Sequence, residues 1–160
     1  MFRVLFVCTG NICRSPTAEG VFRNLVEARG LSDRIVADSA GIGSWHVGDP
    51  PDPRSQQTAQ ECGIDLSMQR ARSVAADDFE TFDLILAMDS GHFRSLKNSC
   101  PDRYADRIRM FMDYAPDTGI ADVPDPYYGT GDGFTQVFDM IEQASRGLLA
   151  KLEKRQLAGS

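Results

Sequence analysis

The N-terminal segment combines a nucleophile with groups that bind an anion. Cys8 closes an apolar run, Arg14 lies six residues later, and a segment with helical signals follows. A loop that leads into a helix turns its free N–H groups toward one point, where the helix dipole adds about half a positive charge. A guanidinium there can grip two phosphate oxygens. The spacing therefore predicts a phosphate site, with a cysteine placed to attack the bound phosphorus.

The same positive field favours a reactive cysteine. The thiolate is the nucleophile, and a helix N-terminus or a nearby arginine stabilises it, so we expect Cys8 to be ionised at neutral pH. Ser15 is placed to donate its hydroxyl to the sulfur. Gly10 permits close backbone approach, and Asn11 tolerates a left-handed conformation. The alternative is that Cys8 is a small core residue and Arg14 a solvated surface charge, the commoner fate of each taken alone.

Alternating strand and helix patterns predict the frame that holds this loop. Apolar runs predict strands at residues 2–7, 35–37, 84–88 and 107–112. Helical spacing and end signals predict helices at residues 15–30, with Ser15 as the N-cap, and at 53–62, 90–98 and 134–152. We expect a single three-layer α/β domain with a four-stranded parallel sheet, helices on both faces and a phosphate-binding loop after the first strand.

Two long connections and the chain end complete this organisation. Residues 40–53 and 113–133 are dense in Gly, Pro and Asp, and connections of this length are more often functional loops than linkers. We expect the domain to span residues 1–154 and a frayed C-terminal tail to span 155–160.

Composition narrows the class of protein. The chain has 160 residues, enough for one hydrophobic core, and a formal net charge of −6, which disfavours nucleic-acid and anionic-membrane partners. No apolar run approaches the roughly 20 residues of a membrane helix. The four cysteines are too few and too irregular for a disulfide framework or a zinc site. We expect a cytoplasmic protein without membrane insertion, metal or organic cofactor.

The segment from Cys8 to Ser15 resembles the phosphate loop of the low-molecular-weight protein tyrosine phosphatases, in which five residues separate the cysteine from an arginine followed by serine. Residues 125–129 resemble the acid loop of that family, and residues 38–41 with Trp45 resemble its middle segment. The resemblance spans roughly the whole chain. It implies a phosphatase that hydrolyses protein tyrosine phosphate through a phosphocysteine intermediate. The phosphate loop then comprises Thr9, Gly10, Asn11, Ile12, Cys13, Arg14 and Ser15.

By this resemblance Asp125 is the general acid, and it becomes the base in the second step. The chemistry also requires such a group, because the leaving oxygen needs a proton. The alternative is a turn-forming aspartate between prolines. Trp45, Tyr127 and Tyr128 would form aromatic walls of the substrate cleft and favour phosphotyrosine over the shorter phosphoserine. Ordinary packing is the alternative for these three side chains.

Further positions resemble family residues that support the phosphate loop without reacting. These loop-supporting positions are Asn11, Ser15, Ser39 and Asp89. One position departs from the pattern, since Gln69 stands where many family members have a histidine. We therefore expect the hydrogen bonds that support the phosphate loop to differ from those of the family. His46, at the expected cleft rim, and His92, in an expected helix, are taken as non-catalytic.

Two forms of regulation are hypotheses at this stage. Cys13 lies in the same loop as Cys8, so mild oxidation could join them in a reversible disulfide, which would make the enzyme redox-sensitive. The tyrosines of the acid loop are phosphorylated in relatives, which makes regulation at Tyr127 or Tyr128 conceivable.

Three other functions remain open. An arsenate reductase on the same scaffold needs a closely spaced cysteine pair, which Cys62 and Cys100 do not resemble. A protein-arginine phosphatase carries threonine where this chain has Ile12 and lacks the tyrosine pair. A non-catalytic phosphotyrosine-binding module would be expected to have lost the nucleophile or the acid. The expected partner is a phosphotyrosine protein substrate, for which a bacterial tyrosine kinase is one family-level candidate, and we expect a monomer or a weak dimer.

Overall fold

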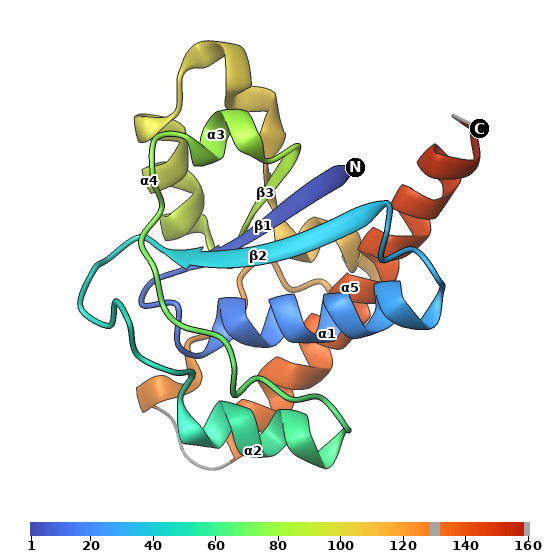
Figure 1. Ribbon diagram of the computed structural model, residues 1–160. Coiled ribbons are helices and arrows are strands. Elements are labelled where there is room, and N and C mark those ends of the chain that lie inside the picture. The colour runs from blue at the N-terminus through green and yellow to red at the C-terminus, as the bar shows by residue number, and fades with distance from the viewer. Residues whose placement is uncertain (129–131, 159–160) are drawn as a thin grey trace.

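A parallel sheet in the strand order β2-β1-β3-β4 forms the centre of the protein (Figure 1). The computed structural model describes residues 1–128 and 132–158, with the backbone alone at Tyr128 and at residues 156–158. The strands are β1 (Phe2–Cys8), β2 (Ile35–Gly41), β3 (Leu84–Ala87) and β4 (Ile108–Met110). The α-helices are α1 (Arg14–Ala28), α2 (Pro53–Glu61), α3 (Asp78–Thr81), α4 (Ser90–Ser99) and α5 (Asp132–Ala158). Short 3-10 helices are η1 (Asp102–Arg107), η2 (Phe111–Tyr114), η3 (Pro116–Thr118) and η4 (Pro126–Tyr128).

Helices cover both faces of the sheet, which confirms the expected three-layer α/β fold (Figure 1). Helices α1 and α5 pack on one face around Phe6 and Phe22, and α2 lies on the same side. Helices α3 and α4 cover the other face around Leu5 and Ile85. Strand β1 is apolar on both faces because helices exclude water from each side, as expected for a central parallel strand.

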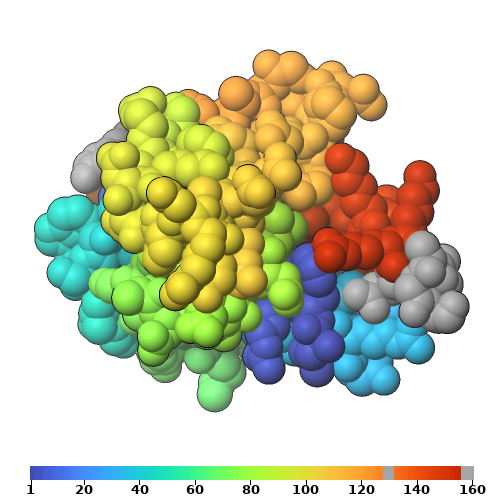
Figure 2. All heavy atoms as spheres, turned by 90° about the horizontal axis from the view of Figure 1, so that it is seen from above, coloured from blue at the N-terminus to red at the C-terminus, as the bar shows by residue number. Residues whose placement is uncertain are grey.

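The start of β1 lies beside the C-terminal part of α5, at the edge of the sheet opposite the carboxyl ends of the strands (Figure 2). Figure 2 shows that the first residues reach the surface beside the C-terminal part of α5. The Arg155 guanidinium lies 5.2 Å from the centre of the Phe2 ring. Helix α5 continues to Ala158. The segment that was expected to fray, from residue 155 onward, is therefore helical as far as Ala158. Among the described helices, none is long and apolar enough to cross a membrane.

The structure corrects several predicted boundaries. Helix α1 begins at Arg14, with Cys13 as its N-cap, so the prediction of Ser15 as the cap was wrong. Strand β2 extends to Gly41, beyond the predicted end at residue 37, because its polar residues pair with all of β1. Strand β4 is shorter than predicted, since the chain turns into η2 at Phe111 and buries that ring against the core.

Candidate active site

The phosphate loop leaves β1 at the carboxyl edge of the sheet and is fixed there by the chain that follows β2. Cys8, the last residue of β1, is paired with Gly41. The carbonyl oxygens of Cys8 and Thr9 accept hydrogen bonds from the N–H groups of Ile42 and Gly43, each at 2.9 Å. A Cβ at Gly41 would lie 2.9 Å from the Thr9 carbonyl oxygen, so this close approach depends on glycine.

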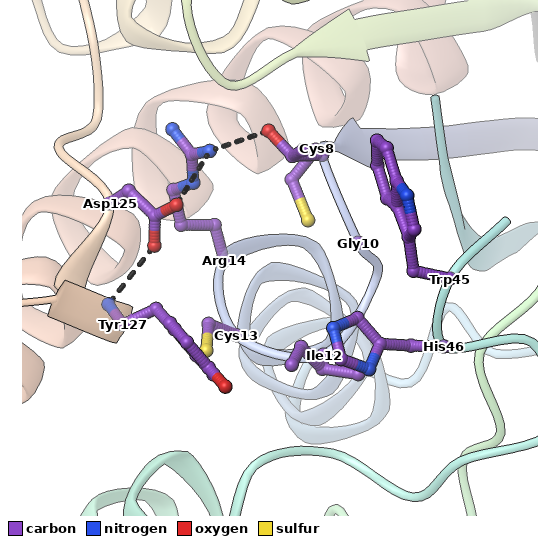
Figure 3. A pocket seen from close by; sticks show the side chains of 10 residues that line it. Cys8, Gly10, Ile12, Cys13, Arg14, Trp45, His46, Asp125 and Tyr127 are labelled. Carbon is purple, nitrogen blue, oxygen red and sulfur yellow. Dashed lines mark hydrogen bonds and ion pairs between the residues drawn. The ribbon is translucent and has the colours of Figure 1, made fainter. Parts of the chain in front are cut away.

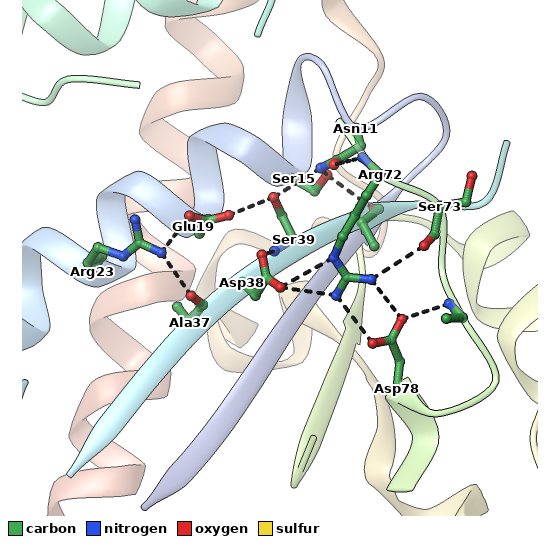
Figure 4. Close-up of polar contacts among 12 residues, drawn as sticks. Asn11, Ser15, Glu19, Arg23, Ala37, Asp38, Ser39, Arg72, Ser73 and Asp78 are labelled. Atoms are coloured by element: carbon green, nitrogen blue, oxygen red, sulfur yellow. Dashed lines mark hydrogen bonds and ion pairs between the residues drawn. The ribbon is translucent and has the colours of Figure 1, made fainter. Parts of the chain in front are cut away.

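Asn11 holds the middle of the loop. Its φ of 59° is left-handed, as the sequence predicted, and the residue is buried. Its Nδ2 donates to Ser15 Oγ at 2.8 Å and to Ser39 Oγ at 3.0 Å (Figure 4). Its Oδ1 accepts from the Arg72 backbone N–H at 3.0 Å, and Ser39 donates onward to Glu19 at 2.7 Å. These expected loop-supporting positions therefore lie together in one network.

Sequence reasoning did not predict the contacts of two charged side chains in this network, Arg72 and Glu19. Arg72 donates to Asp78 at 2.9 Å and to Asp38 at 3.1 Å, which ties the loop before α3 to β2 (Figure 4). Burial raises the pKa of Glu19, although the guanidinium of Arg23, 2.7 Å away, favours the charged form. The one available signal was the four-residue spacing of Glu19 and Arg23 on the predicted helix. Arg72 gave no such signal, because Asp38 is distant from it in sequence and Asp78 lies outside the predicted helices and strands.

Gln69 contacts α1 instead of the loop. Its Nε2 donates to the Pro16 carbonyl oxygen at 3.0 Å. Its Oε1 is buried without a hydrogen-bond partner among the described residues. The main-chain N–H of Arg72 supplies the hydrogen bond to Asn11 Oδ1. The support of Asn11 from this segment is therefore a backbone contact.

Cys8 is 3% exposed and lies beside a hydroxyl at the base of a cavity. Its Sγ is 3.0 Å from Ser15 Oγ. Ser15 Oγ accepts from Asn11 Nδ2, and its one hydrogen has two acceptors within reach, the Ala40 carbonyl oxygen at 3.4 Å and the sulfur at 3.0 Å. A Cys8 thiolate would be the nearer and more strongly charged of these acceptors. The use of this hydroxyl inside the site explains why Ser15 does not cap α1.

Cys13 differs from Cys8 in its surroundings, although both side chains line the cavity and both are free thiols. Burial, followed by the charge of Asp52, raises the pKa of Cys13 to about 12. Cys13 is therefore a neutral thiol at pH 7.

Arg14 is almost fully buried, and its hydrogen bonds fix its plane. Nη1 donates to Asp89 Oδ2 and to the Val123 carbonyl oxygen, each at 2.9 Å. Nη2 donates to Thr9 Oγ1 at 3.1 Å. Burial opposes ionisation of Asp89, but the backbone hydrogen bond from His92 and the hydrogen bond and charge of Arg14 outweigh it and lower its pKa. Asp89 thus stays a carboxylate that orients the guanidinium.

Asp125 reaches the same point from the long connection before α5. Its Oδ2 lies 3.7 Å from Arg14 Nη2, and its Oδ1 accepts from the Tyr127 backbone N–H at 3.0 Å (Figure 3). The side chain is 37% exposed, so it is open to the cavity and to water. Residues far apart in sequence therefore meet at one edge of the sheet.

A cavity of about 340 Å³ joins these groups. Figure 3 shows Cys8 and Arg14 toward its base, with Trp45 and His46 on one side and Tyr127 on the other. Trp45 is 75% exposed, so it forms a wall that is open to solvent. The residues that line the cavity are Cys8, Thr9, Gly10, Ile12, Cys13, Arg14, Trp45, His46, Asp125 and Tyr127. The Tyr128 side chain, expected to be a third aromatic wall, lies outside the described part of the structure.

Comparison with known proteins identifies the scaffold. The family model for low molecular weight phosphotyrosine protein phosphatase matches residues 3–157. The chain belongs to this family. A low molecular weight protein-tyrosine-phosphatase of Streptomyces coelicolor is 46% identical over 157 residues, which cover 96% of this chain and 95% of that protein.

Solved structures of the family show how closely the fold is shared. A protein tyrosine phosphatase from Entamoeba histolytica, with Hepes in the active site, has a TM-score of 0.94 at 37% identity and covers 98% of this chain and 99% of its own. YwlE from Bacillus subtilis, an arginine phosphatase, has a TM-score of 0.85 at 32% identity in a mutant whose active site serine is phosphorylated. That match covers 96% of this chain and 97% of YwlE. The fold is thus shared by family members that differ in phosphoamino acid.

Proposed function

We propose that this phosphatase hydrolyses protein tyrosine phosphate through a phosphocysteine intermediate. The observation that carries the proposal is the convergence of Cys8, Arg14 and Asp125 on one cavity (Figure 3). These side chains would serve as nucleophile, phosphate clamp and proton donor. Membership of the family supports the same assignment.

In the first step the Cys8 thiolate attacks phosphorus in line with the leaving oxygen. The N–H groups at the start of α1 and the Arg14 guanidinium bind the three remaining oxygens and stabilise their charge as the new S–P bond forms. The P–O bond to the substrate breaks, and Asp125 gives its proton to the leaving oxygen. The products are phosphocysteine and a free tyrosine side chain.

In the second step a water molecule attacks the phosphocysteine. Asp125 is now ionised and removes the water proton, which returns the carboxyl group to its starting state. The S–P bond breaks, and the sulfur leaves as a thiolate. Ser15 Oγ, 3.0 Å from Sγ, donates a hydrogen bond that stabilises this leaving group.

The walls of the cavity favour an aromatic phosphoester. Trp45 and Tyr127 present ring surfaces on either side of the loop, against which a substrate ring can stack (Figure 3). Ile12 lines the same cavity with an apolar side chain, where arginine phosphatases carry threonine. We assign Tyr128 to the same cleft on the resemblance alone. The preferred substrate is therefore phosphotyrosine in a protein, and arginine phosphate is the second candidate because of the likeness to YwlE.

The remaining expectations are part of the proposal. A bacterial tyrosine kinase is one candidate protein substrate, and we place the enzyme in the cytoplasm. Oxidation of Cys8 is expected to lead to a disulfide with Cys13, since both side chains line one cavity. The arsenate reductase alternative has no support in the cysteines, because Cys100 is buried while Cys62 is exposed.

The proposal is tested by trapping the intermediate. A phosphotyrosine peptide labelled with ³²P is mixed with enzyme and quenched within milliseconds, and the label is located by proteolysis and mass spectrometry. We expect label on Cys8, and loss of turnover by at least about a thousandfold in Cys8→Ser. Label on Cys13 or His46, or a Cys8→Ser variant with near-normal turnover, would overturn the mechanism.

A further inference from the structure

His92 lies where helix α4 meets the phosphate loop, and neither step of the proposed reaction uses it. The residue is 5% exposed and sits in the first turn of α4, which Asp89 caps. Its ring Nε2 is 2.7 Å from Thr9 Oγ1 and 3.4 Å from Arg14 Nη2. The sequence predicted a helix around His92 and no catalytic role for it, and it gave no sign of this contact with the site.

The donors and acceptors around His92 fix where its proton lies. Arg14 has only donors, so Thr9 Oγ1 accepts from Nη2 at 3.1 Å. Arg14 Nη2, which can only donate, also lies 3.4 Å from His92 Nε2, so the contacts of Nε2 with Thr9 and with Arg14 are both favourable only when Nε2 is unprotonated and the Thr9 hydrogen points to it. The imidazole hydrogen is consequently on Nδ1, 3.2 Å from Asp89 Oδ1.

The opposite tautomer is disfavoured by the same carboxylate. It would place the Nδ1 lone pair, which is buried, against Asp89 Oδ1, and two acceptors at that distance repel. The contact is electrostatic, since among the described residues Nδ1 has no well-aligned hydrogen bond. Because Asp89 Oδ2 accepts from Arg14 Nη1, the four residues Thr9, Arg14, Asp89 and His92 form a closed ring of contacts.

The surroundings of His92 keep it neutral. Burial lowers its pKa to about 4, and the charge of Arg14 acts in the same direction. The carboxylates of Asp89, Asp125 and Asp122 raise the pKa but do not offset these effects. At neutral pH the ring is therefore an acceptor for Thr9.

We propose that His92 is a positioning residue for Arg14, acting through the Thr9 hydroxyl. With Asp89 on one terminal nitrogen and Thr9 on the other, the guanidinium keeps the plane that matches the equatorial oxygens of the transition state. The inference rests on the proposed function, because it assigns a way of orienting the phosphate clamp of that reaction. Loss of the contact between Thr9 and His92 should destabilise the transition state more than the bound substrate. It should therefore change kcat more than KM.

Two variants test this role of His92, and each removes one partner of the hydrogen bond between Thr9 Oγ1 and His92 Nε2. His92→Phe removes the acceptor, and Thr9→Val removes the hydroxyl with little change in volume. We expect each to lower kcat about tenfold, the effect of one lost hydrogen bond, with KM changed less than about twofold. The double variant should be no slower than the slower single variant, because both remove the same interaction. His92→Gln, whose carbonyl can accept the Thr9 hydrogen, should keep more activity than His92→Phe.

The matched control is Leu96→Val, a buried change on the same helix that does not touch the loop. It should lower stability and leave kcat unchanged. Vanadate, which mimics the transition state, should bind His92→Phe about tenfold more weakly than the wild type, while phosphate affinity changes less. Additive losses in the double variant, or equal losses in kcat for His92→Phe and Leu96→Val, would overturn the proposal.

A measurement on the wild type does not depend on any variant folding. Nitrogen chemical shifts of the His92 ring at pH 7 should show a protonated Nδ1 and an unprotonated Nε2. A protonated Nε2 would refute the assignment. A wild type that turns over no phosphotyrosine peptide, yet shows the Nδ1 tautomer, would count against the proposed function and leave the ring of contacts in place.

Discussion

Arg14 is oriented by the protein itself. Its Nη1 hydrogens are taken by Asp89 and by the Val123 carbonyl oxygen, and one Nη2 hydrogen is taken by Thr9. Nη2 also lies 3.4 Å from His92 Nε2, and among the described residues no acceptor bonds Nε, which is left to bind a phosphate oxygen. A clamp held in this way loses little freedom when the transition state forms, and such preorganised charge is often the largest single contribution to catalysis.

Asp125→Asn tests the proton donor. The amide cannot give a proton to the leaving oxygen, so we expect hydrolysis of tyrosine phosphate to slow by about 10²–10⁴-fold. Hydrolysis of an aryl phosphate with a strongly acidic phenol should slow much less, since that leaving group departs without a proton. The measurement is kcat for both substrates. Equal losses on the two would mean that Asp125 only shapes its loop.

His92 also predicts a pH dependence of stability. Its pKa is about 4 in the folded protein, against about 6.5 in the unfolded chain, so the unfolded state binds more protons between these values. Stability from this group is complete above about pH 6.5 and falls by about 3 kcal/mol as the pH drops to about 4.

Urea unfolding at several pH values measures this loss, with His92→Gln as the control. The variant should show a smaller decrease between pH 7 and pH 4, because the titrating group is gone. The lowered pKa of Asp89 acts mainly at more acidic pH, since its stabilising contribution is lost as the pH falls through and below the ordinary aspartate pKa. Parallel curves for the two proteins would show that His92 titrates normally in the folded state.

At the scale of elements, the phosphate loop is a bridge between β1 and α1 whose shape depends on its hydrogen bonds. Asn11 contributes both a left-handed backbone and bonds to Ser15, Ser39 and Arg72. These two contributions can be separated by substitution.

Asn11→Ala should destabilise the protein more than Asn11→Gly. Both variants lose the side-chain hydrogen bonds, but only alanine adds the cost of a left-handed conformation, about 1–2 kcal/mol. Both should lose most activity, because the loop is no longer held. Chemical denaturation and kcat measure the two effects. Equal stabilities for the variants would show that the loop relaxes to an ordinary backbone when the side chain is removed.

Helix α5 packs against η2 at a glycine. A Cβ at Gly147 would overlap the Tyr114 carbonyl oxygen, so Gly147→Ala should destabilise the protein by about 2 kcal/mol. Gly133→Ala, in the same helix, is the control, since among the described residues a Cβ there meets Pro126 alone, at 3.8 Å. That change should stabilise by up to about 1 kcal/mol, the usual gain of alanine over glycine in a helix. A neutral Gly147→Ala would mean that α5 can shift away from Tyr114.

Much of the frame could be predicted because its signals are local. The apolar run before Cys8 and the spacing of apolar residues after residue 134 are periodic patterns, and both elements were predicted correctly. The predicted cap of α1, Ser15, lies two residues after the observed cap, Cys13, and the Ser15 hydroxyl binds Cys8 and Asn11 instead. The ring of contacts around His92 could not be predicted, since it joins side chains separated by more than seventy residues.

At the scale of the whole molecule, a chain of net charge −6 carries an anion-binding site. The positive groups that bind an anion are concentrated at one place, with Arg14 and the start of α1 at the base of the cavity. The same architecture serves relatives that differ in substrate, as the likeness to YwlE shows. The proposed preference for phosphotyrosine therefore rests on the residues that line the cavity and not on the fold.

The most direct test is the rate of phosphate release from matched phosphotyrosine, phosphoserine and phosphoarginine peptides, with arsenate reduction assayed in parallel. The account predicts a kcat/KM for phosphotyrosine at least about a hundredfold above the others, abolished in Cys8→Ser and inhibited by vanadate. Efficient hydrolysis of phosphoarginine, or reduction of arsenate, without activity on phosphotyrosine would contradict the proposed function while leaving the Cys8 site intact.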